Sequence, residues 1–368
     1  MRSTKETSRI KAREAAEELA ADLLTKEKPA PNSFQFTVFA ERFERKASAL
    51  SASGERNANY MKTAVYCLHN AEWGLLQHFA KMDIRELRTR HWTEFLALIT
   101  TRRPDLSPST KNTLSATFRN VMKVARDAGV VDDLPATPRT KRRDNPRAFF
   151  RFHPLVPKEC DSYKLLLAAA QEAARTGQMV RGTRITDELY DLILFMAHSF
   201  VRPTVSELYA LRHNDVQIAS DPKRLVITIR NGKTGYRVAN TMPAAVTVYE
   251  RILKRYPKAT GEDFIFLPHH RNRTTGARVV ARQFNHVLTT AGLKRDPATG
   301  AVHTVYSLRH TAICMRIIHS EGQVNIFNLA KNAGTSVEQI ERFYARHLPL
   351  SAGMARNLQS FGGAVIAT

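Results

Sequence analysis

The chain reads Gly334-Thr-Ser-Val-Glu-Gln-Ile-Glu-Arg-Phe-Tyr344 toward its carboxyl end. The spacing of Val337, Ile340 and Tyr344 predicts one face of a short helix. The Thr-x-x-Glu run that starts at Thr335 matches a capping box, which would start the helix there. By itself this segment therefore leaves two roles open for Thr335, a helix cap or a ligand contact. By itself it also makes Tyr344 an ordinary half-buried aromatic residue.

Three segments upstream also stand out, and each carries a basic residue. They are Phe200-Val-Arg-Pro-Thr-Val-Ser-Glu207, Asn231-Gly-Lys-Thr-Gly-Tyr-Arg237 and Tyr306-Ser-Leu-Arg-His-Thr-Ala312. Arg202 follows apolar residues and precedes a predicted helix at about 205–212, so it is a poor candidate for a solvated arginine. Glu207 is expected to brace Arg202 or a backbone amide.

The second of these segments predicts a β-hairpin. Residues 224–230 alternate as a strand does, and 236–239 would form the returning strand. Asn231-Gly232 between them is a strong signal for a hairpin turn. Lys233 is therefore expected at the tip of the hairpin. A lone lysine there is ordinarily a solvated turn residue.

Taken in order, the four segments resemble the tyrosine recombinase, or phage integrase, family. That family has an Arg before a helix, a Lys in a β-hairpin, a His-x-x-Arg motif at a helix start, and a Tyr ten residues after a Leu-Gly-His glycine. Arg202, Lys233, Arg309 and Tyr344 occupy the Arg, Lys, Arg and Tyr positions here, and Gly334 is ten residues before Tyr344. The resemblance covers the helical N-terminal part and residues 150–350.

Two positions depart from the family pattern. Tyr306 stands where the family has the His of His-x-x-Arg, and Thr335 stands where it has the His after the Gly. The spacing from Arg202 to Glu207 is also longer than usual. The combination is similar to a subgroup of element-borne integrases. The identity of the general base is left open: a tyrosine has too high a pKa to replace an imidazole, and His310 is either the base or structural.

The resemblance implies a role for each residue. Tyr344 would attack the scissile phosphorus and form a 3′-phosphotyrosine, while Arg202 and Arg309 would grip the non-bridging oxygens. Lys233 would protonate the departing 5′-oxygen. Tyr306 would form a hydrogen bond to the phosphate or to Arg309, and Thr335 would donate a hydrogen bond from its hydroxyl to a phosphate oxygen. No cofactor, nucleotide or metal is expected.

Composition points in the same direction. The chain has 56 Lys and Arg against 34 Asp and Glu, a formal net charge of +22, with ordinary hydrophobic (43%) and charged (24%) fractions. Such an excess on a folded protein predicts a polyanionic partner, with nucleic acid before an anionic membrane. No phosphate-binding loop, dinucleotide glycine motif or metal-ligand spacing is present.

The sequence shows neither a membrane-spanning segment nor a secretion signal. The apolar stretch 192–201 is interrupted by His198 and Ser199 and is shorter than a membrane span. The first thirty residues have no signal-peptide core. Cys67, Cys160 and Cys314 fit neither a disulfide framework nor a zinc knuckle, which indicates a reducing compartment. We expect a cytoplasmic, nucleoid-associated bacterial protein without a membrane partner.

The predicted fold is mainly α with a small β-sheet, a helical core-binding domain joined to an α+β tyrosine-recombinase catalytic domain. Residues 1–33 read as a charged N-terminal helix or arm, 34–137 as the DNA-binding core-binding domain, and 153–368 as the catalytic domain with a C-terminal tail. Helices are expected from about 36, at 57–79, 90–101 and from 108, then at 162–176, 187–199, 244–256, 278–291, 307–320, 324–332 and 336–345.

A basic linker at 138–152 would join the two domains. Its prolines and clustered positive charges predict an extended segment that contacts DNA phosphates, or else a solvated loop. Its candidate DNA-binding residues are Arg139, Lys141, Arg142, Arg143, Arg147 and Arg151.

The resemblance also implies the partners. These are double-stranded DNA attachment sites, a homotetramer on paired sites, and excision or DNA-bending accessory factors, in the integration and excision of a mobile element. The apolar residues after Tyr344 are hypothesised to dock on a neighbouring subunit. Two alternatives stay open: a type IB topoisomerase, and a non-catalytic DNA-binding regulator on the same fold.

Overall fold

The computed structural model describes residues 33–56, 58–141, 147–152, 161–297, 299–320 and 323–344, with Arg13, Glu17, Leu348, Ala355, Arg356 and Gln359. The chain divides into two compact units, Met1–Arg143 and Asp144–Thr368. Almost all of the predicted N-terminal arm and of the C-terminal tail lies outside the described residues. Arg142, Arg143 and Cys160 lie outside them as well.

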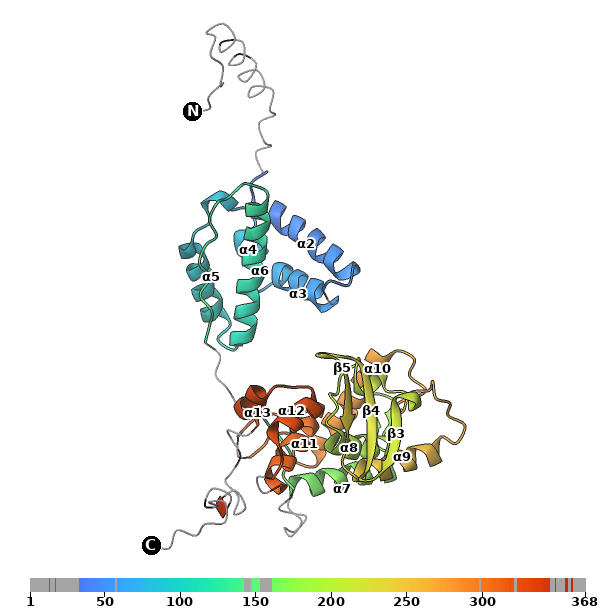
Figure 1. Ribbon diagram of the computed structural model, residues 1–368. Helices are drawn as coiled ribbons and strands as arrows, with labels where there is room; N and C mark the ends of the chain where they lie inside the picture. Colours follow the sequence, from blue (N-terminus) through green and yellow to red (C-terminus); the bar gives the residue numbers. More distant parts are fainter. Residues whose placement is uncertain are drawn as a thin grey trace. The chain divides into compact units, whose positions relative to one another are not determined.

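The described part of the first unit is helical (Figure 1). Its elements are α2 (Phe36–Ala52), α3 (Ala58–His69), α4 (Leu75–Phe79), the 3-10 helix η1 (Ile84–Glu86), α5 (Thr89–Arg102) and α6 (Pro108–Asp127). Helix α6 begins as its sequence predicts. The Ser107 hydroxyl accepts a hydrogen bond from the Thr110 amide at 3.1 Å, and Pro108 occupies the first turn, where a missing N–H costs nothing.

The single helix predicted over 57–79 is instead two helices, α3 and α4. The chain turns sharply between them, and a Cβ on Gly74 would lie 2.4 Å from the Asn70 carbonyl oxygen. The Asn70 side chain also accepts the amides of Glu72 and Trp73. Periodicity continues across this turn, which is why the sequence pattern did not reveal it.

Aromatic rings fill the core of the first unit. Phe79 and Phe118 have centroids 5.0 Å apart, and Trp92 lies 5.2 Å from Phe118. Phe36 and Phe95 contact the same cluster, and all five side chains are almost completely buried. Burial of large rings is the main stabilising contribution to a helical unit of this size.

The second unit combines helices with two small antiparallel sheets. Its helices are α7 (Ser162–Arg175), α8 (Asp187–Ser199), α9 (Ala244–Arg255), α10 (Arg273–Thr290), α11 (Val305–His319), α12 (Ile326–Ala333) and α13 (Val337–Phe343), with short 3-10 helices η3 (Leu208–Ala210) and η4 (His213–Asp215). The strands are β1 (Met179–Val180), β2 (Thr183–Arg184), β3 (Val216–Ser220), β4 (Lys223–Gly232) and β5 (Gly235–Asn240).

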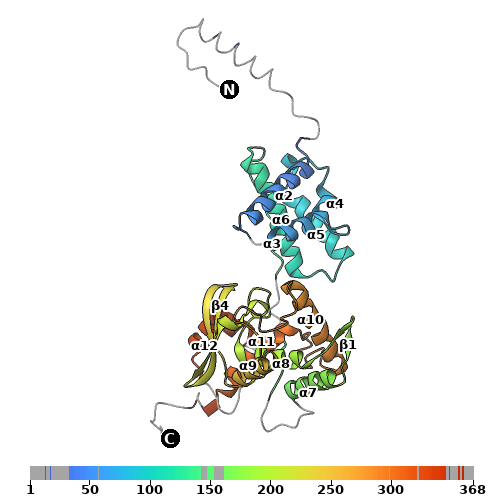
Figure 2. The same ribbon diagram turned by 90° about the vertical axis from the view of Figure 1, so that its right-hand side faces the viewer.

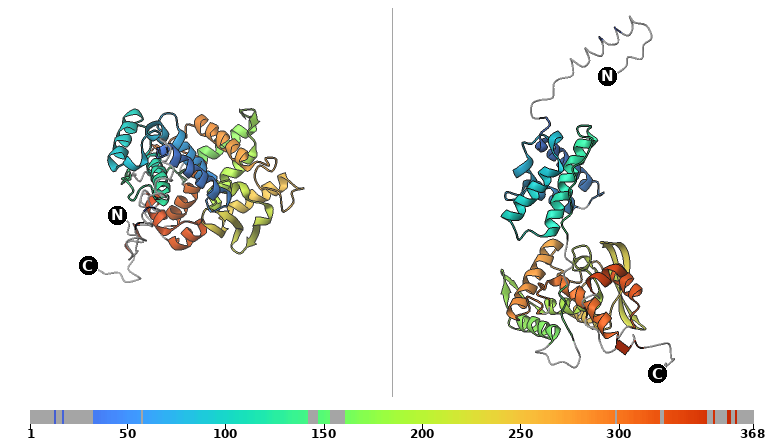
Figure 3. Two further views of the ribbon diagram at one scale, coloured as in Figure 1. Left: turned by 90° about the horizontal axis from the view of Figure 1, so that it is seen from above. Right: turned by 90° about the vertical axis from the view of Figure 1, so that its left-hand side faces the viewer.

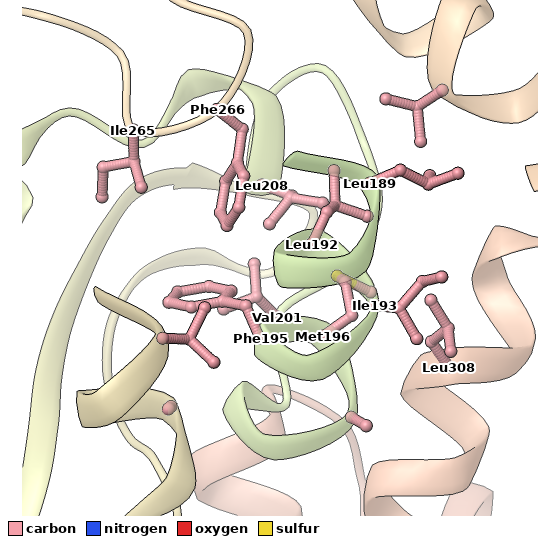
Figure 4. Packing of buried hydrophobic residues seen from close by; sticks show 14 of the residues in the cluster. Leu189, Leu192, Ile193, Phe195, Met196, Val201, Leu208, Ile265, Phe266 and Leu308 are labelled. Carbon is pink, nitrogen blue, oxygen red and sulfur yellow. The ribbon is translucent and has the colours of Figure 1, made fainter. Parts of the chain in front are cut away.

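Helix α8 lies at the centre of this unit. Helices α7, α9 and α11 pack against it. Figure 4 shows its apolar residues, among them Leu192, Phe195 and Met196, beside Phe266 from a loop and Leu308 from α11. An apolar helix surrounded by other elements is typical of a domain centre. The rigid core around α8 supports the end of that helix, where Arg202 follows.

The two sheets lie on opposite sides of the second unit (Figures 2 and 3). The β1–β2 hairpin is beside α10, and the β3–β4–β5 sheet is beside α9 and α12. The Asn332 side chain of α12 accepts the Asn240 amide at 2.7 Å and donates to the Asn240 carbonyl at 2.9 Å. Strand β5 is therefore joined to α12 by hydrogen bonds along its outer edge.

The second unit differs from the sequence-based expectations in three further places. Residues 205–212 do not form an α-helix, because the chain folds back so that the Leu208 amide donates to the Arg202 carbonyl, and only η3 follows. The hairpin turn is Lys233-Thr234, since Gly232 pairs with Gly235 and Asn231 belongs to β4. Strands β1, β2 and β3 were not predicted. Within the described residues, each helix is too short or too polar to cross a membrane.

Candidate active site

One cavity of about 650 Å³ in the second unit brings the predicted catalytic residues together. They come from four places: the loop after α8, the β4–β5 turn, α11, and the chain from the α12–α13 turn to the end of α13. The cavity is lined by Arg202, Lys233, Tyr306, Arg309, His310, Thr335 and Tyr344, and also by Arg147. Residues separated by more than a hundred positions in sequence thus face a single space.

Helix α11 supplies three of these side chains from its first turns. Tyr306, Arg309 and His310 are spaced i, i+3 and i+4, so they lie on one face of the helix. Thr304 caps the helix, and its backbone amide donates to the Ser307 hydroxyl at 3.1 Å. The cap fixes the start of the helix and with it the direction of all three side chains.

Arg309 is buried with only 1% of its surface exposed. Its two terminal nitrogens donate to the carbonyls of Phe200, at the end of α8, and Ala333, at the end of α12. Its Nε is buried and has no hydrogen-bond partner among the described residues. Burial lowers the pKa of this guanidinium from its very high usual value. The free donor is a place where a bound anion would satisfy an otherwise costly group.

Arg202 is held by a buried carboxylate that it shares with a second arginine. Glu207 accepts from Arg202 Nη1 at 2.6 Å and from Arg237 Nη2 at 2.7 Å, and it also accepts the Arg202 amide at 3.1 Å. Burial would raise the pKa of Glu207, but hydrogen bonds from Arg237 and Arg202 lower it to about 2. The brace expected for Arg202 is therefore present, and Arg237 extends it.

Arg237 ends the segment Asn231–Arg237, and no role was predicted for it. It lies on β5, on the same face as the buried Ala239, and it is 9% exposed. A charged residue on the buried face of an alternating strand is the signal that could have identified it. A Cβ on Gly232 would approach Arg237 Nη1 to 2.9 Å, so the guanidinium also packs against the turn that contains Lys233.

Gly334 forms the turn between α12 and α13 with φ +61°, a conformation that glycine adopts without strain. Arg202 Nη2 donates to its carbonyl. A Cβ here would lie 2.8 Å from the Arg237 side chain. Helix α13 is capped by Ser336, whose hydroxyl accepts the Gln339 amide at 3.2 Å. The capping role considered for Thr335 is therefore wrong, and its half-buried side chain lines the cavity instead.

Tyr344 ends α13 and is 7% exposed. Burial raises the pKa of its phenol, and the positive charge of Arg309 acts in the opposite direction. The His310 ring lies between two tyrosines, 5.2 Å from Tyr306 and 5.1 Å from Tyr344 between centroids. Burial, with the charges of Arg147 and Arg309, lowers the pKa of His310 to about 3, so the ring is neutral at physiological pH.

The six basic residues predicted to bind DNA fall in different places. Arg139 and Lys141 are exposed at the end of the first unit, and Arg142 and Arg143 lie outside the described residues. In the second unit, Arg147 lines the cavity, and exposed Arg151 has its Nη2 3.9 Å from Asp296 Oδ1. The segment predicted as one basic linker therefore contributes to both units. In the described residues, no three His, Cys, Asp or Glu side chains gather as metal ligands would.

Comparison with known proteins gives structural matches only. No protein-family model and no curated protein sequence matches the chain. A lambda integrase tetramer bound to a Holliday junction has a TM-score of 0.55 at 15% identity, covering 89% of this chain and 88% of that one. The Tn1549 transposon integrase in complex with circular intermediate DNA has 0.52 at 16%, covering 88% and 99%. The XerH site-specific recombinase bound to palindromic difH substrate has 0.53 at 14%, covering 91% and 98%.

These likenesses establish the fold. The chain has the mainly α architecture with small β-sheets that these three recombinases share, and the alignment extends over both units. The predicted fold class is confirmed. At such identities the shared fold does not assign roles to side chains, so the chemistry has to be argued from the cavity.

Proposed function

We propose that this protein is a site-specific tyrosine recombinase that cuts and rejoins DNA strands through a covalent bond to Tyr344. The observation that supports this best is the convergence of Arg202, Lys233, Arg309 and Tyr344 on one cavity. The net charge of +22 supports a DNA substrate. The DNA named in the three structures above adds support from the shared fold.

In the proposed cleavage step, a phosphodiester enters the cavity and Tyr344 Oη attacks its phosphorus. The bond from phosphorus to the 5′-oxygen breaks, and its electron pair stays on that oxygen, which receives a proton from Lys233. The phenol proton of Tyr344 passes to a base, for which His310 is the candidate. The product is a 3′-phosphotyrosine and a free 5′-hydroxyl. No bond energy is lost to water, so the 5′-hydroxyl of another strand can attack the phosphotyrosine and restore the diester. Neither metal nor nucleotide takes part in these steps.

Two guanidinium groups and two hydroxyl groups would stabilise the charge that grows on the phosphate oxygens. Arg309 has a buried Nε–H without a partner among the described residues, and Arg202 is fixed beside it by Glu207 and the Gly334 carbonyl. Guanidinium groups suit the two non-bridging oxygens of a phosphate. Because the donors are positioned before substrate arrives, little reorganisation is needed at the moment of reaction. Tyr306 and Thr335 add neutral hydroxyl donors.

His310 is the candidate acceptor of the Tyr344 proton. Its neutral ring adjoins Tyr344, and its Nδ1 has no partner among the described residues. Two of the three causes that lower its pKa are the charges of Arg147 and Arg309. A phosphate bound near these arginines would offset their charges and make the imidazole more basic. Substrate binding would thereby prepare the base that the nucleophile requires.

The proposal also includes the DNA substrate, the assembly, the biological role and the partners. We infer attachment sites in double-stranded DNA as substrates, a homotetramer on two paired sites, and the integration and excision of a mobile element, with excision or DNA-bending factors as partners. The lambda integrase tetramer on a Holliday junction supports the tetramer by analogy of fold. Residues 34–137 would grip DNA as the core-binding domain, and residues 138–152 would follow the phosphate backbone.

The second candidate is a non-catalytic DNA-binding regulator. One observation favours it: Tyr306 and Thr335 occupy positions where a basic imidazole is usual in the proposed family. A regulator would bind its site in a salt-sensitive manner but would have no need of a reactive tyrosine. A type IB topoisomerase would form the same covalent bond but would relax supercoiled DNA without pairing two sites.

Trapping of a covalent protein–DNA adduct tests the proposal. DNA flanking the gene for this protein is incubated with the wild type, Tyr344→Phe and Tyr306→Phe in the presence of a chelator, and the reaction is stopped with detergent. We expect an adduct with the wild type and, more slowly, with Tyr306→Phe, which controls for the other tyrosine of the cavity.

The expected result with Tyr344→Phe is tight DNA binding without an adduct. An adduct that persists in Tyr344→Phe contradicts the assigned nucleophile. Salt-sensitive wild-type binding without any adduct favours the regulator. Relaxation of supercoiled plasmid without recombination between two sites favours the topoisomerase.

A further inference from the structure

Residues 147–152 are anchored to the second unit by buried contacts. Ala148, Phe149 and Phe150 are buried. The Phe150 amide donates to Thr311 Oγ1 at 2.8 Å, and its ring stacks on His303 with centroids 4.2 Å apart. Thr311 lies on α11, the helix that supplies Tyr306, Arg309 and His310. This part of the basic segment is therefore fixed relative to the cavity.

The anchored segment places Arg147 at the cavity wall. Its guanidinium lies 4.9 Å from the centroid of the Phe343 ring, and Phe343 is the residue before Tyr344. Stacking on an aromatic face orients an arginine and leaves its N–H groups available in the plane of the guanidinium. The positive charge of Arg147 also helps to lower the pKa of His310, whose ring lies beside Tyr344.

The three arginines of the cavity differ in how their charges are balanced. Arg202 is paired with Glu207, and Arg309 donates to two carbonyls. Arg147 is exposed, and its guanidinium contacts the Phe343 ring rather than a carboxylate of the described residues. Its charge is thus the least compensated of the three and is the one most available to an anion in the cavity.

We propose that Arg147 is a catalytic residue that binds the scissile phosphodiester directly, as a third guanidinium beside Arg202 and Arg309. This inference depends on the proposed recombinase function. The role proposed for Arg147 differs from that of the other basic residues of 138–152, which would contact DNA phosphates away from the scissile one. Since Tyr306 and Thr335 add only neutral donors, Arg147 supplies positive charge where negative charge increases in the transition state.

Arg147→Gln and Arg175→Gln form a matched pair for the test. Both residues are exposed arginines of the second unit, but Arg175 lies at the end of α7 and does not line the cavity. Two quantities are measured on full-length protein: the affinity for the site, and the single-turnover rate of adduct formation at saturating protein. We expect Arg147→Gln to lower the rate about 100-fold while affinity changes little. Arg175→Gln should keep the wild-type rate.

A substrate with a methylphosphonate at the scissile position distinguishes contact from a structural effect. A methyl group replaces the charged non-bridging oxygen, so the linkage is neutral and a residue that acts by charge on the phosphate loses its importance. The ratio of wild-type to Arg147→Gln rates should fall to a few-fold on this substrate. An effect through packing against Phe343 would keep the ratio unchanged, and thermal unfolding of both variants gives an independent measure of any damage.

The outcomes distinguish a failure of the role of Arg147 from a failure of the recombinase function. A wild-type rate in Arg147→Gln, an equal loss in Arg175→Gln, or an unchanged ratio on the methylphosphonate overturns the role of Arg147 and leaves the recombinase proposal intact. A wild type that forms no adduct with its own bound site overturns the recombinase proposal and the role of Arg147 with it.

Discussion

The two units bury different kinds of side chain. In the described residues of the first unit, the buried polar residues are the hydroxyl-bearing Ser115, Thr117 and Thr137, and aromatic rings fill the rest of the core. The described part of the second unit buries several acidic residues and three arginines, Arg202, Arg237 and Arg309. All three arginines lie at the cavity or in contact with Glu207 beside it.

The buried aromatic residues of the first unit stabilise its fold, whereas the buried arginines of the second unit serve the proposed chemistry. Apolar burial stabilises a fold without directional constraint, whereas each buried charge costs several kcal/mol unless other groups compensate it. The second unit uses Glu207 and three backbone carbonyls for that compensation. The arrangement keeps cationic donors inside the protein, where an anion can reach them. Four predictions, from the largest effect to the smallest, test the contrast.

Phe118→Ala should produce the largest loss of stability. The ring is fully buried among Phe36, Phe79 and Trp92. Its removal should lower the free energy of unfolding of the first unit by about 3–5 kcal/mol, measured by denaturant unfolding. Tyr66→Ala, at a ring that is 58% exposed, is the control. A loss in Phe118→Ala no larger than in Tyr66→Ala would contradict the aromatic core as the main source of stability there.

Glu207→Gln should destabilise the second unit and impair cleavage together. The change leaves two buried guanidiniums without their counter-charge, which costs about 3 kcal/mol. Adduct formation should fall because Arg202 loses its orientation. Glu262→Gln breaks an exposed ion pair with Arg212 and should leave both unfolding and cleavage nearly unchanged. Equal unfolding free energies for Glu207→Gln and Glu262→Gln would contradict the claim that the buried arginines of the second unit need Glu207 as their counter-charge.

Gly334→Ala should have an intermediate effect. Its positive φ costs an alanine about 1–2 kcal/mol, and the new Cβ would collide with Arg237. Gly292→Ala is a matched control, because Gly292 has φ +68° with open space around the Cβ position. Both variants should lose some stability, whereas the adduct rate should fall about tenfold or more in Gly334→Ala alone. A normal rate in Gly334→Ala would show that this turn does not position the arginines.

The smallest expected effect concerns pH. His310 has a pKa of about 3 in the folded chain, below the ordinary value of about 6.5 for an unfolded histidine. The unfolded state therefore binds more protons in this range, and stability decreases as pH falls below about 6.5.

His310→Asn should reduce this decrease by about 1 kcal/mol between pH 7 and pH 5.5. Denaturant unfolding of wild type and variant in matched buffers gives the comparison. Parallel pH profiles would mean that His310 is protonated as readily in the folded chain as in the unfolded one.

Local sequence was sufficient for most helices. Ser107 and Pro108 start α6 where predicted, and α7 and α8 match the predicted ranges closely. These elements depend on caps and on periodicity within one segment. The split at Gly74, the absence of a helix at 205–212 and the shift of the hairpin turn to Lys233-Thr234 depend on contacts between neighbouring turns. Such contacts leave no periodic signal.

The candidate site divides in the same way. Spacing and residue type by themselves determined which side chains to examine, because Arg202, Lys233, Arg309 and Tyr344 stand in a recognisable order. Only the tertiary structure decided that Arg237 shares Glu207 with Arg202, that Ser336 and not Thr335 caps α13, and that Arg147 faces the cavity while Arg151 does not. The physical reason is that a motif specifies only residue types and their spacing along the chain. The compensation of buried charges depends on distances between side chains, and these are set only when the chain folds.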